Sequence, residues 1–200
     1  MTVDTSKFAA SSNIIFVLGG PGSGKGTQSA FLVQRFPELC HLSAGDLLRE
    51  EVADKNSELG EEISHMIKNG LIVRAEVTVK LLQNAMAKNP EKKLFLIDGF
   101  PRAIAQAECF EKMVGTCKFV LLLDVPEDVM RDRLLERGKT SGRTDDNVES
   151  IIKRFRTYRE TTMPVIELYH ERVVTVRGDR TPEEVSAELE SLFSQVIATE

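Results

Sequence analysis

Short, continuously apolar runs alternate along the chain with longer stretches in which apolar residues recur at helical spacing. Strands that are apolar throughout are typical of parallel sheets, because helices cover both of their faces. The pattern predicts strands at 14–18, 94–97, 119–123 and 173–176, with a brief fifth candidate at 40–42. It predicts helices between them at 25–36, 75–88, 103–113, 127–136, 147–169 and 182–196.

This order of elements predicts an α/β fold, a doubly wound parallel sheet in which ligands bind at the carboxyl ends of the strands. Two polar segments do not fit its core. Residues 43–73 predict a small helical insert, and the glycine-bearing residues 137–146 predict a short mobile lid. The core would then comprise 13–42, 74–136 and 147–200, after a flexible leader at 1–12.

Composition and charge narrow the range of partners. The 200 residues carry a net charge of −5, which argues against nucleic acid or an anionic membrane as a partner. No apolar run approaches the length of a membrane span, and residues 1–12 resemble neither a signal peptide nor a transit peptide. Cys40, Cys109 and Cys117 show no C-x-x-C spacing, so we expect reduced packing residues in a cytosolic protein. We also expect a monomer, because no exposed apolar stripe is evident.

The stretch from Gly19 to Thr27, GGPGSGKGT, directly follows the first apolar run. Glycines let the backbone approach a ligand closely, and a helix starting near Gly24 adds partial positive charge at its N-terminus. Lys25 supplies a full positive charge where the β- and γ-phosphates of a nucleotide would lie. The stretch therefore predicts a phosphate-binding loop. Gly26 stands where Ser or Thr usually follows the lysine, which leaves the usual hydroxyl contact to Mg²⁺ open.

Arginines gather at strand ends, beside glycines and in the predicted lid. The six concerned are Arg49, Arg102, Arg133, Arg137, Arg143 and Arg154. A guanidinium group binds two phosphate oxygens at once and stabilises charge that develops during phosphoryl transfer. Their number predicts a site for more phosphates than one nucleotide carries. The alternative is solvated arginines paired with carboxylates, and we prefer it for Arg156, Arg159 and Arg172.

Four motifs, in this order along the chain, resemble those of the nucleoside monophosphate kinases. They are 20–27 (GPGSGKGT), 43–49 (SAGDLLR), 98–102 (DGFPR) and 137–147 (RGKTSGRTDDN). The resemblance runs from about residue 14 to 192 and is greatest to the eukaryotic UMP–CMP kinase branch, fungal uridylate kinases included. It implies a P-loop fold whose insert binds the monophosphate, and in this family Gly26-Thr27 is the usual form. It also implies ATP as donor, Mg²⁺ as cofactor, and a cytoplasmic location with the nucleus as a second compartment.

The resemblance assigns the ATP site to the loop and to basic residues beyond it. The residues implied are Gly20, Pro21, Gly22, Ser23, Gly24, Lys25, Gly26, Thr27, Arg133, Arg137 and Arg180. Among these, Arg180 would touch the adenine base through its backbone. The catalytic residues implied are Lys25, Arg102, Arg137, Arg143 and Arg154.

The acceptor site implied by the resemblance lies between the insert and the strand ends. Its residues are Ser43, Ala44, Gly45, Arg49, Leu71, Ile72, Val73, Gly99, Arg102, Gln106, Arg143 and Arg154. Arg49 and Arg102 would clamp the monophosphate. No nucleophilic side chain is needed, because the attacking group is a phosphate oxygen of the acceptor. Catalysis then consists of alignment, exclusion of water and neutralisation of charge.

Two roles are open for Asp98, which ends a predicted strand: holding Mg²⁺ through water molecules, or fixing the phosphate loop by hydrogen bonds. Asp145 and Asp146 are expected to orient lid arginines rather than to bind metal. No catalytic role is assigned to the three histidines, His41, His65 and His170.

The residues that would recognise the acceptor's base give conflicting indications. Ala44 stands where adenylate kinases often carry Thr and resembles the pyrimidine branch, as does the stretch 72–78 despite Arg74 in place of proline. Gln106 is the residue with which adenylate kinases read adenine, although fungal uridylate kinases can carry it too; the alternative is an exposed helix residue. We favour UMP and CMP, with dCMP, over AMP. A nucleotide-gated switch is a further alternative, but six placed arginines favour transfer between two nucleotides.

Overall fold

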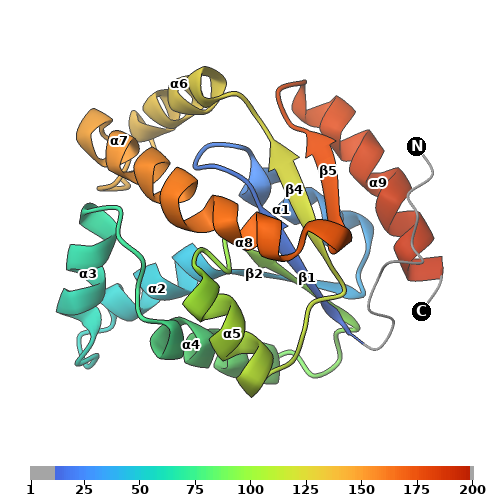
Figure 1. The fold of residues 1–200 in the computed structure, drawn as a ribbon, viewed down its shortest axis with the longest axis horizontal. Coiled ribbons are helices and arrows are strands. Elements are labelled where there is room, and N and C mark those ends of the chain that lie inside the picture. Colours follow the sequence, from blue (N-terminus) through green and yellow to red (C-terminus); the bar gives the residue numbers. More distant parts are fainter. Residues whose placement is uncertain (1–11, 199–200) are drawn as a thin grey trace.

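The five apolar runs form the strands of one parallel sheet in the computed structural model (Figure 1), which describes residues 12–198. The strands are β1 (Ile14–Leu18), β2 (Leu39–Ser43), β3 (Leu94–Asp98), β4 (Phe119–Asp124) and β5 (Val173–Arg177). Their order across the sheet is β2-β3-β1-β4-β5, so the chain passes from β1 to the edge strand β2, returns to β3 beside β1, and then crosses to β4 and β5 on the other side. This confirms the predicted doubly wound sheet and its brief fifth strand at 40–42.

The helices begin and end within a few residues of the predicted positions. They are α1 (Lys25–Arg35), α2 (Ala44–Ala53), α3 (Gly60–Lys68), α4 (Ala75–Ala87), α5 (Ile104–Met113), α6 (Glu127–Gly138), α7 (Val148–Thr157), α8 (Met163–Leu168) and α9 (Pro182–Ala198). Residues 1–11 of the predicted leader lie outside the described residues. Ser12 is described, and its hydroxyl donates to the carbonyl of Thr116 at 2.7 Å. Within residues 12–198, no helix combines the length and the apolar character needed to cross a bilayer.

The segment predicted as a helix over 147–169 is helical from Val148 to Leu168, but it is not a regular α-helix throughout. A π-helical turn, Tyr158–Thr162, separates α7 from α8, and a short 3₁₀ turn, His170–Arg172, follows. Pro164, in the first turn of α8, accounts for the interruption. Proline has no N–H for the usual helical bond, and its ring clashes with the carbonyl four residues earlier, so the preceding turn widens.

Alternate residues of each strand face two separate cores. Phe16 of β1 packs with Phe100, Phe110 and Tyr169 on one face, and the rings of Phe16 and Phe110 meet edge to face with centroids 5.3 Å apart. The neighbouring residues Ile15 and Val17 face the other core, against α1 and α9. Coverage on both faces is the reason that β1, β3 and β4 are apolar until their carboxyl ends, whereas the outer strands β2 and β5 also carry polar residues.

Two smaller clusters support the polar segments beside the strand ends. Leu48, Ile63 and Val73 hold α2 and α3 of the insert together. Met130, Leu134, Ile151 and Phe155 join α6 to α7, between which the lid crosses. The insert and the lid are therefore both anchored by packed apolar side chains near the carboxyl edge of the sheet. The three cysteines are free thiols, and Cys40 and Cys117 are buried, as expected of packing residues.

Candidate active site

The loop after β1 folds as the glycine pattern requires. Gly22 has a φ of +86°, and a Cβ there would lie 2.5 Å from the carbonyl oxygen of Met130. Both observations exclude a larger residue at this position. Gly24 precedes α1 in a left-handed conformation, so the first N–H groups of the helix point into the turn. The loop is thus shaped to receive an anion by main-chain donors.

Lys25 lies inside this loop, where its Nζ donates to the carbonyls of Gly19 and Gly20, both at 2.9 Å. Burial, together with the guanidinium groups of three arginines in the cleft, lowers the pKa of Lys25 from 10.5 to about 8. The Asp98 carboxylate opposes this shift. A cation that is partly destabilised in this way is disposed to bind phosphate, which supplies the missing negative charge.

We expect the binding of ATP to take up protons at about pH 8.5 and not at about pH 6.5. Lys25 loses its proton near pH 8 in the protein, and the charge of the phosphates would raise its pKa again. The affinity for ATP should therefore fall as the pH rises through about 8. Calorimetric titrations in buffers of different ionisation enthalpy measure the uptake directly. Lys25→Arg is the control, because arginine stays charged throughout; equal uptake by this variant would contradict the assignment.

A cavity of about 410 Å³ opens at the carboxyl ends of β1, β2 and β3, a volume within the range of small-molecule sites. The predicted residues that line it are Pro21, Gly22, Gly24, Lys25, Gly26, Thr27, Ser43, Ala44, Gly45, Arg49, Leu71, Ile72, Val73, Asp98, Gly99, Arg102, Gln106, Arg137, Arg143 and Arg154. A second hollow beside α6 is lined by Ser23, Arg133 and Arg180, together with Gly22, Gly24, Thr27 and Arg137. Gly20 lines neither space, although its carbonyl accepts from Lys25.

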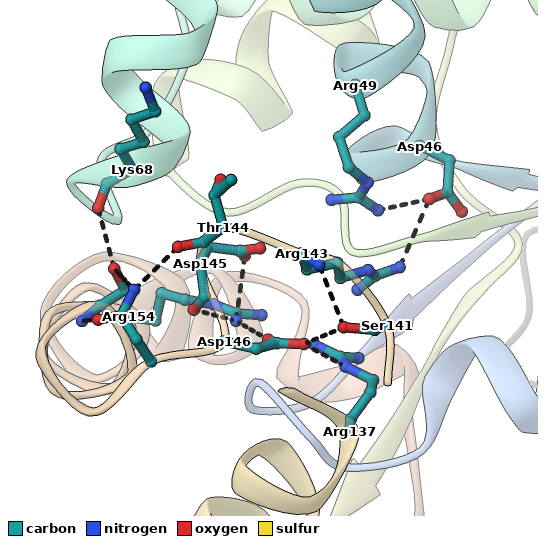
Figure 2. Close-up of polar contacts among 12 residues, drawn as sticks. Asp46, Arg49, Lys68, Arg137, Ser141, Arg143, Thr144, Asp145, Asp146 and Arg154 are labelled. Atoms are coloured by element: carbon teal, nitrogen blue, oxygen red, sulfur yellow. Dashed lines mark hydrogen bonds and ion pairs between the residues drawn. The ribbon is translucent and has the colours of Figure 1, made fainter. Parts of the chain in front are cut away.

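The lid end of the cavity is organised by one buried carboxylate (Figure 2). Asp146, whose side chain is fully buried, accepts from Arg137 Nε and Nη2 at 2.7 Å each and from Arg154 Nη1 at 2.9 Å. Burial by itself would raise the pKa of Asp146, but its hydrogen bonds to Arg137 and the charges of both arginines hold that pKa below its usual value. Asp145 also pairs with Arg154, at 3.1 Å. Asp146 thus holds the lid arginine Arg137, as predicted, whereas Asp145 pairs with Arg154 of α7 and not with an arginine of the lid.

A second carboxylate joins the insert to the lid. Asp46 of α2 pairs with Arg49 at 2.5 Å and with Arg143 of the lid at 3.5 Å (Figure 2). The pKa of Arg143 is lowered by burial and by the neighbouring charge of Arg49. Each guanidinium group engages Asp46 through one nitrogen, so other N–H donors remain for an anion between them. The geometry suits recognition of a phosphate shared by two elements.

Arg102 is held where β3 gives way to α5. Its Nε donates to the carbonyl of Gly99 at 2.7 Å, and its backbone N–H donates to Gln106 Oε1 at 2.9 Å. Gln106 is 4% exposed, and its Nε2 donates to the carbonyl of Val73 at 3.1 Å. The alternative of an exposed helix residue is therefore wrong. Gln106 connects Arg102 to the residues that close the insert, at the wall of the cavity.

Asp98 lies beside His41, a residue to which the sequence analysis gave no catalytic role. Asp98 Oδ2 is 3.5 Å from His41 Nε2, on the adjacent strand β2. Asp98 and Thr27 both line the cavity, so residues with oxygen ligands for a hard cation are present. Among the residues described, no three acidic, histidine or cysteine side chains gather as a cage. This set fits Mg²⁺, which keeps several waters and takes phosphate oxygens alongside one or two carboxylates.

Beside α6, two arginines frame the second hollow. Arg133 Nη1 donates to the carbonyl of Gly178 at 2.9 Å, and Arg180 donates to the carbonyl of Arg177 and pairs with Glu188. Their side chains are anchored, so the backbone of 178–180 is held beside the phosphate loop. Of the arginines interpreted as structural, Arg159 pairs with Glu127 and Arg172 donates to Thr116 Oγ1 and the Cys117 carbonyl, whereas Arg156 is exposed.

Close contact between the insert and α7 narrows the cavity. Gly70 has a φ of +64°, and a Cβ there would lie 3.1 Å from the backbone nitrogen of Arg154. The carbonyl of Gly70 accepts from Thr157 Oγ1 at 2.6 Å, and that of Lys68 accepts from Ser150 Oγ at 3.2 Å. A glycine at the end of α3 thus lets the insert approach the helix that carries Arg154.

Sequence reasoning missed several residues that line the cavity. They are Leu18, Gly19, Asp46, Leu48, Ile67, Gly70, Thr78, Thr157, Tyr158 and Thr162. Asp46 lies inside a recognised motif, which was a sufficient signal. For Thr157, Tyr158 and Thr162 the one available signal was Pro164, which indicates an irregular turn in the helix that presents them.

Comparisons with known proteins agree with this geometry. Residues 17–174 match the family described as adenylate kinase. The chain is 55% identical over 177 residues to the uridylate kinase of Saccharomyces cerevisiae, covering 86% of each chain. It is 50% identical to the UMP-CMP kinase of Lentinula edodes, over 96% of this chain and 90% of the relative. It is also 51% identical to adenylate kinase 1 of Schistosoma mansoni, over 88% and 90% of the two chains.

Proposed function

Because the chain belongs to the adenylate kinase family, we propose that it transfers the γ-phosphoryl group of ATP to UMP or CMP, with dCMP as a third acceptor. The products are ADP and the pyrimidine diphosphate. The observation that carries this proposal is the convergence of Lys25 with Arg49, Arg102, Arg137, Arg143 and Arg154 on one cavity. The relatives named uridylate kinase and UMP-CMP kinase support a pyrimidine acceptor. The whole site comes from a single chain, so a monomer suffices.

Each nucleotide has a place in this arrangement. The ATP phosphates lie in the loop from Gly20 to Thr27 and against Lys25, and adenine lies in the hollow between Arg133 and Arg180. The acceptor's phosphate lies between Arg49 and Arg102, and its base lies under the insert, near Ala44 and Gln106. The two phosphate chains then meet between the loop and the arginines of the lid.

The reaction needs alignment and charge neutralisation rather than a nucleophilic side chain. An oxygen of the acceptor's phosphate attacks the γ-phosphorus, and the bond to the β-phosphate oxygen breaks. Lys25, Arg137, Arg143 and Arg154 surround the position of the transferred group and stabilise the charge spread over its oxygens. The lid excludes water that would otherwise hydrolyse ATP. Mg²⁺, held through water by Asp98 and near Thr27, would neutralise further phosphate charge when bound.

The test is release of ADP from ATP and Mg²⁺ with UMP, CMP, dCMP, AMP, GMP or no acceptor, in parallel reactions. We expect the highest kcat/KM with UMP or CMP and a lower value with AMP. AMP as the best acceptor would turn the assignment to adenylate kinase, the alternative that the Schistosoma relative and Gln106 favour. ADP release that no acceptor increases would favour a nucleotide-gated switch and contradict phosphoryl transfer.

Ala44→Thr is expected to shift the ratio of kcat/KM for UMP to that for AMP toward AMP by roughly tenfold. Ala44 is 3% exposed and lines the cavity, so a hydroxyl and a methyl added there reach the base pocket. Parallel kinetics with both acceptors measure the ratio. Ala53→Thr is the matched control, because Ala53 is exposed at the far end of the same helix. If the ratio of kcat/KM for UMP to that for AMP is unchanged in both variants, Ala44 does not contribute to recognition of the base.

A further inference from the structure

The π-helical turn Tyr158–Thr162 interrupts the long helix where that helix passes the cavity. A π turn inside an α-helix is rare and is found mostly at functional sites. Here the residue that ends α7, Thr157, and the residue that ends the π turn, Thr162, both line the cavity. The turn therefore changes which side chains the helix presents to the proposed site.

The change can be followed from helix geometry. Residues five apart in an α-helix are separated by about 140° around the axis, since each residue advances roughly 100°. Thr157 and Thr162 would then point in different directions. A π turn has i to i+5 hydrogen bonds, so these two residues come to nearly the same side. Each uses its hydroxyl on a different partner: Thr157 Oγ1 donates to the Gly70 carbonyl at 2.6 Å, and Thr162 Oγ1 to the Arg102 carbonyl at 3.1 Å.

The hydrogen bond from Thr162 to the Arg102 carbonyl is one of three that fix Arg102. The backbone N–H of Arg102 donates to Gln106, its carbonyl accepts from Thr162, and its Nε donates to the Gly99 carbonyl. Thr162 is 5% exposed, so water has little access to replace its bond to the carbonyl. The Arg102 side chain, by contrast, is accessible from the cleft. The guanidinium is thus presented from a backbone that is fixed on both sides.

We infer that Thr162 is a positioning residue for Arg102, and that the π turn serves to bring its hydroxyl to the Arg102 carbonyl. The inference rests on the proposed function, in which Arg102 binds the acceptor's phosphate. It assigns to Thr162 an effect on the acceptor and not on ATP. The same helix contacts the insert through Thr157, so the insert and Arg102 share one support.

The experiment compares Thr162→Val with Thr162→Ser and with Thr161→Val as the control. Valine removes the donor at nearly constant volume, and serine keeps the hydroxyl. Thr161 is the adjacent threonine of the same turn, and its hydroxyl donates within the helix, to the Thr157 carbonyl at 2.7 Å. Steady-state kinetics give KM for UMP and for ATP, and calorimetry gives the affinity for UMP in the absence of ATP.

We expect Thr162→Val to raise KM for UMP about tenfold while KM for ATP stays within about twofold, and Thr162→Ser to restore the acceptor KM. Thr161→Val should leave both constants near those of the unmodified protein. Equal effects of the two valine variants on KM for UMP, or equal rises in both KM values for Thr162→Val, would overturn the inference. If Thr162→Val does not fold, Thr162→Ala takes its place under the same criteria.

The proposed function and this inference fail in different ways. An unmodified protein that prefers AMP overturns the pyrimidine assignment, and the variants then test Thr162 with AMP as acceptor. An unmodified protein that phosphorylates no monophosphate overturns both. Normal transfer to UMP with an unshifted KM in Thr162→Val overturns the role of Thr162 alone.

Discussion

Lys25→Met is expected to lower kcat by about a thousandfold or more, and to change the melting temperature by no more than about 3 °C. The charge of Lys25 acts on phosphate oxygens, most strongly where charge redistributes during transfer. Its contribution to folding is small, because its ammonium group is buried among arginines that lower its pKa. Turnover from a coupled ADP assay and thermal unfolding followed by circular dichroism measure the two effects separately.

The matched control for this prediction is Lys92→Met. Lys92 also donates its Nζ to a backbone carbonyl, that of Pro37 at 2.9 Å, but it lies at the surface and does not line the cavity. Its replacement should leave kcat unchanged. A Lys25 variant that loses stability in proportion to its activity would show that the lysine supports the fold of the loop, and would contradict the proposed role on phosphate.

Asp146→Asn is expected to lower kcat/KM by about a hundredfold and to destabilise the fold by about 2 kcal/mol. The carboxylate is the common partner of Arg137 and Arg154, and its loss leaves two partly buried guanidinium groups to repel each other. The stability figure is below that of a fully buried pair because the Arg137 side chain is 36% exposed. Urea unfolding gives the free energy, and kinetics with saturating and limiting acceptor separate kcat from KM.

The pH dependence of this variant provides a second check. The pKa of Asp146 in the folded protein is below the ordinary value of 3.8, so its stabilisation is complete above that value. It is lost as the pH falls through the lower, folded pKa. The stability difference between the unmodified protein and Asp146→Asn should therefore shrink in acid. Glu190→Gln removes the exposed pair with Arg35 and should change neither activity nor stability appreciably. A constant difference from neutral to acid pH would show that the charge of Asp146 is not what stabilises the lid.

Local features of the chain could be predicted from the sequence because they depend on neighbours only a few residues away. The strands are buried on both faces, so their apolar runs stand out, and β1 and β3 were located within one residue. The phosphate loop follows from glycines whose backbone conformation other residues rarely adopt, as Gly22 illustrates. Carboxyl ends of parallel strands meet at one edge, and this rule predicts that the motif after β3 lies beside the loop after β1.

Contacts between distant segments depended on how the elements pack. Asp46 belongs to a motif that the sequence reveals, but its pairing with Arg143 could not be predicted, because it requires the insert and the lid to face each other. The lowered pKa of Lys25 arises first from burial in the folded cleft and then from Arg102, Arg154 and Arg137, which reach it from three different segments of the chain. Pro164 marks an interruption near the π turn that presents Thr162, but the sequence does not show that the interruption is a π turn or which carbonyl the Thr162 hydroxyl meets. Hydrophobic patterns encode which face of an element is buried; the partners of individual polar side chains are set by the packing of elements far apart in the chain.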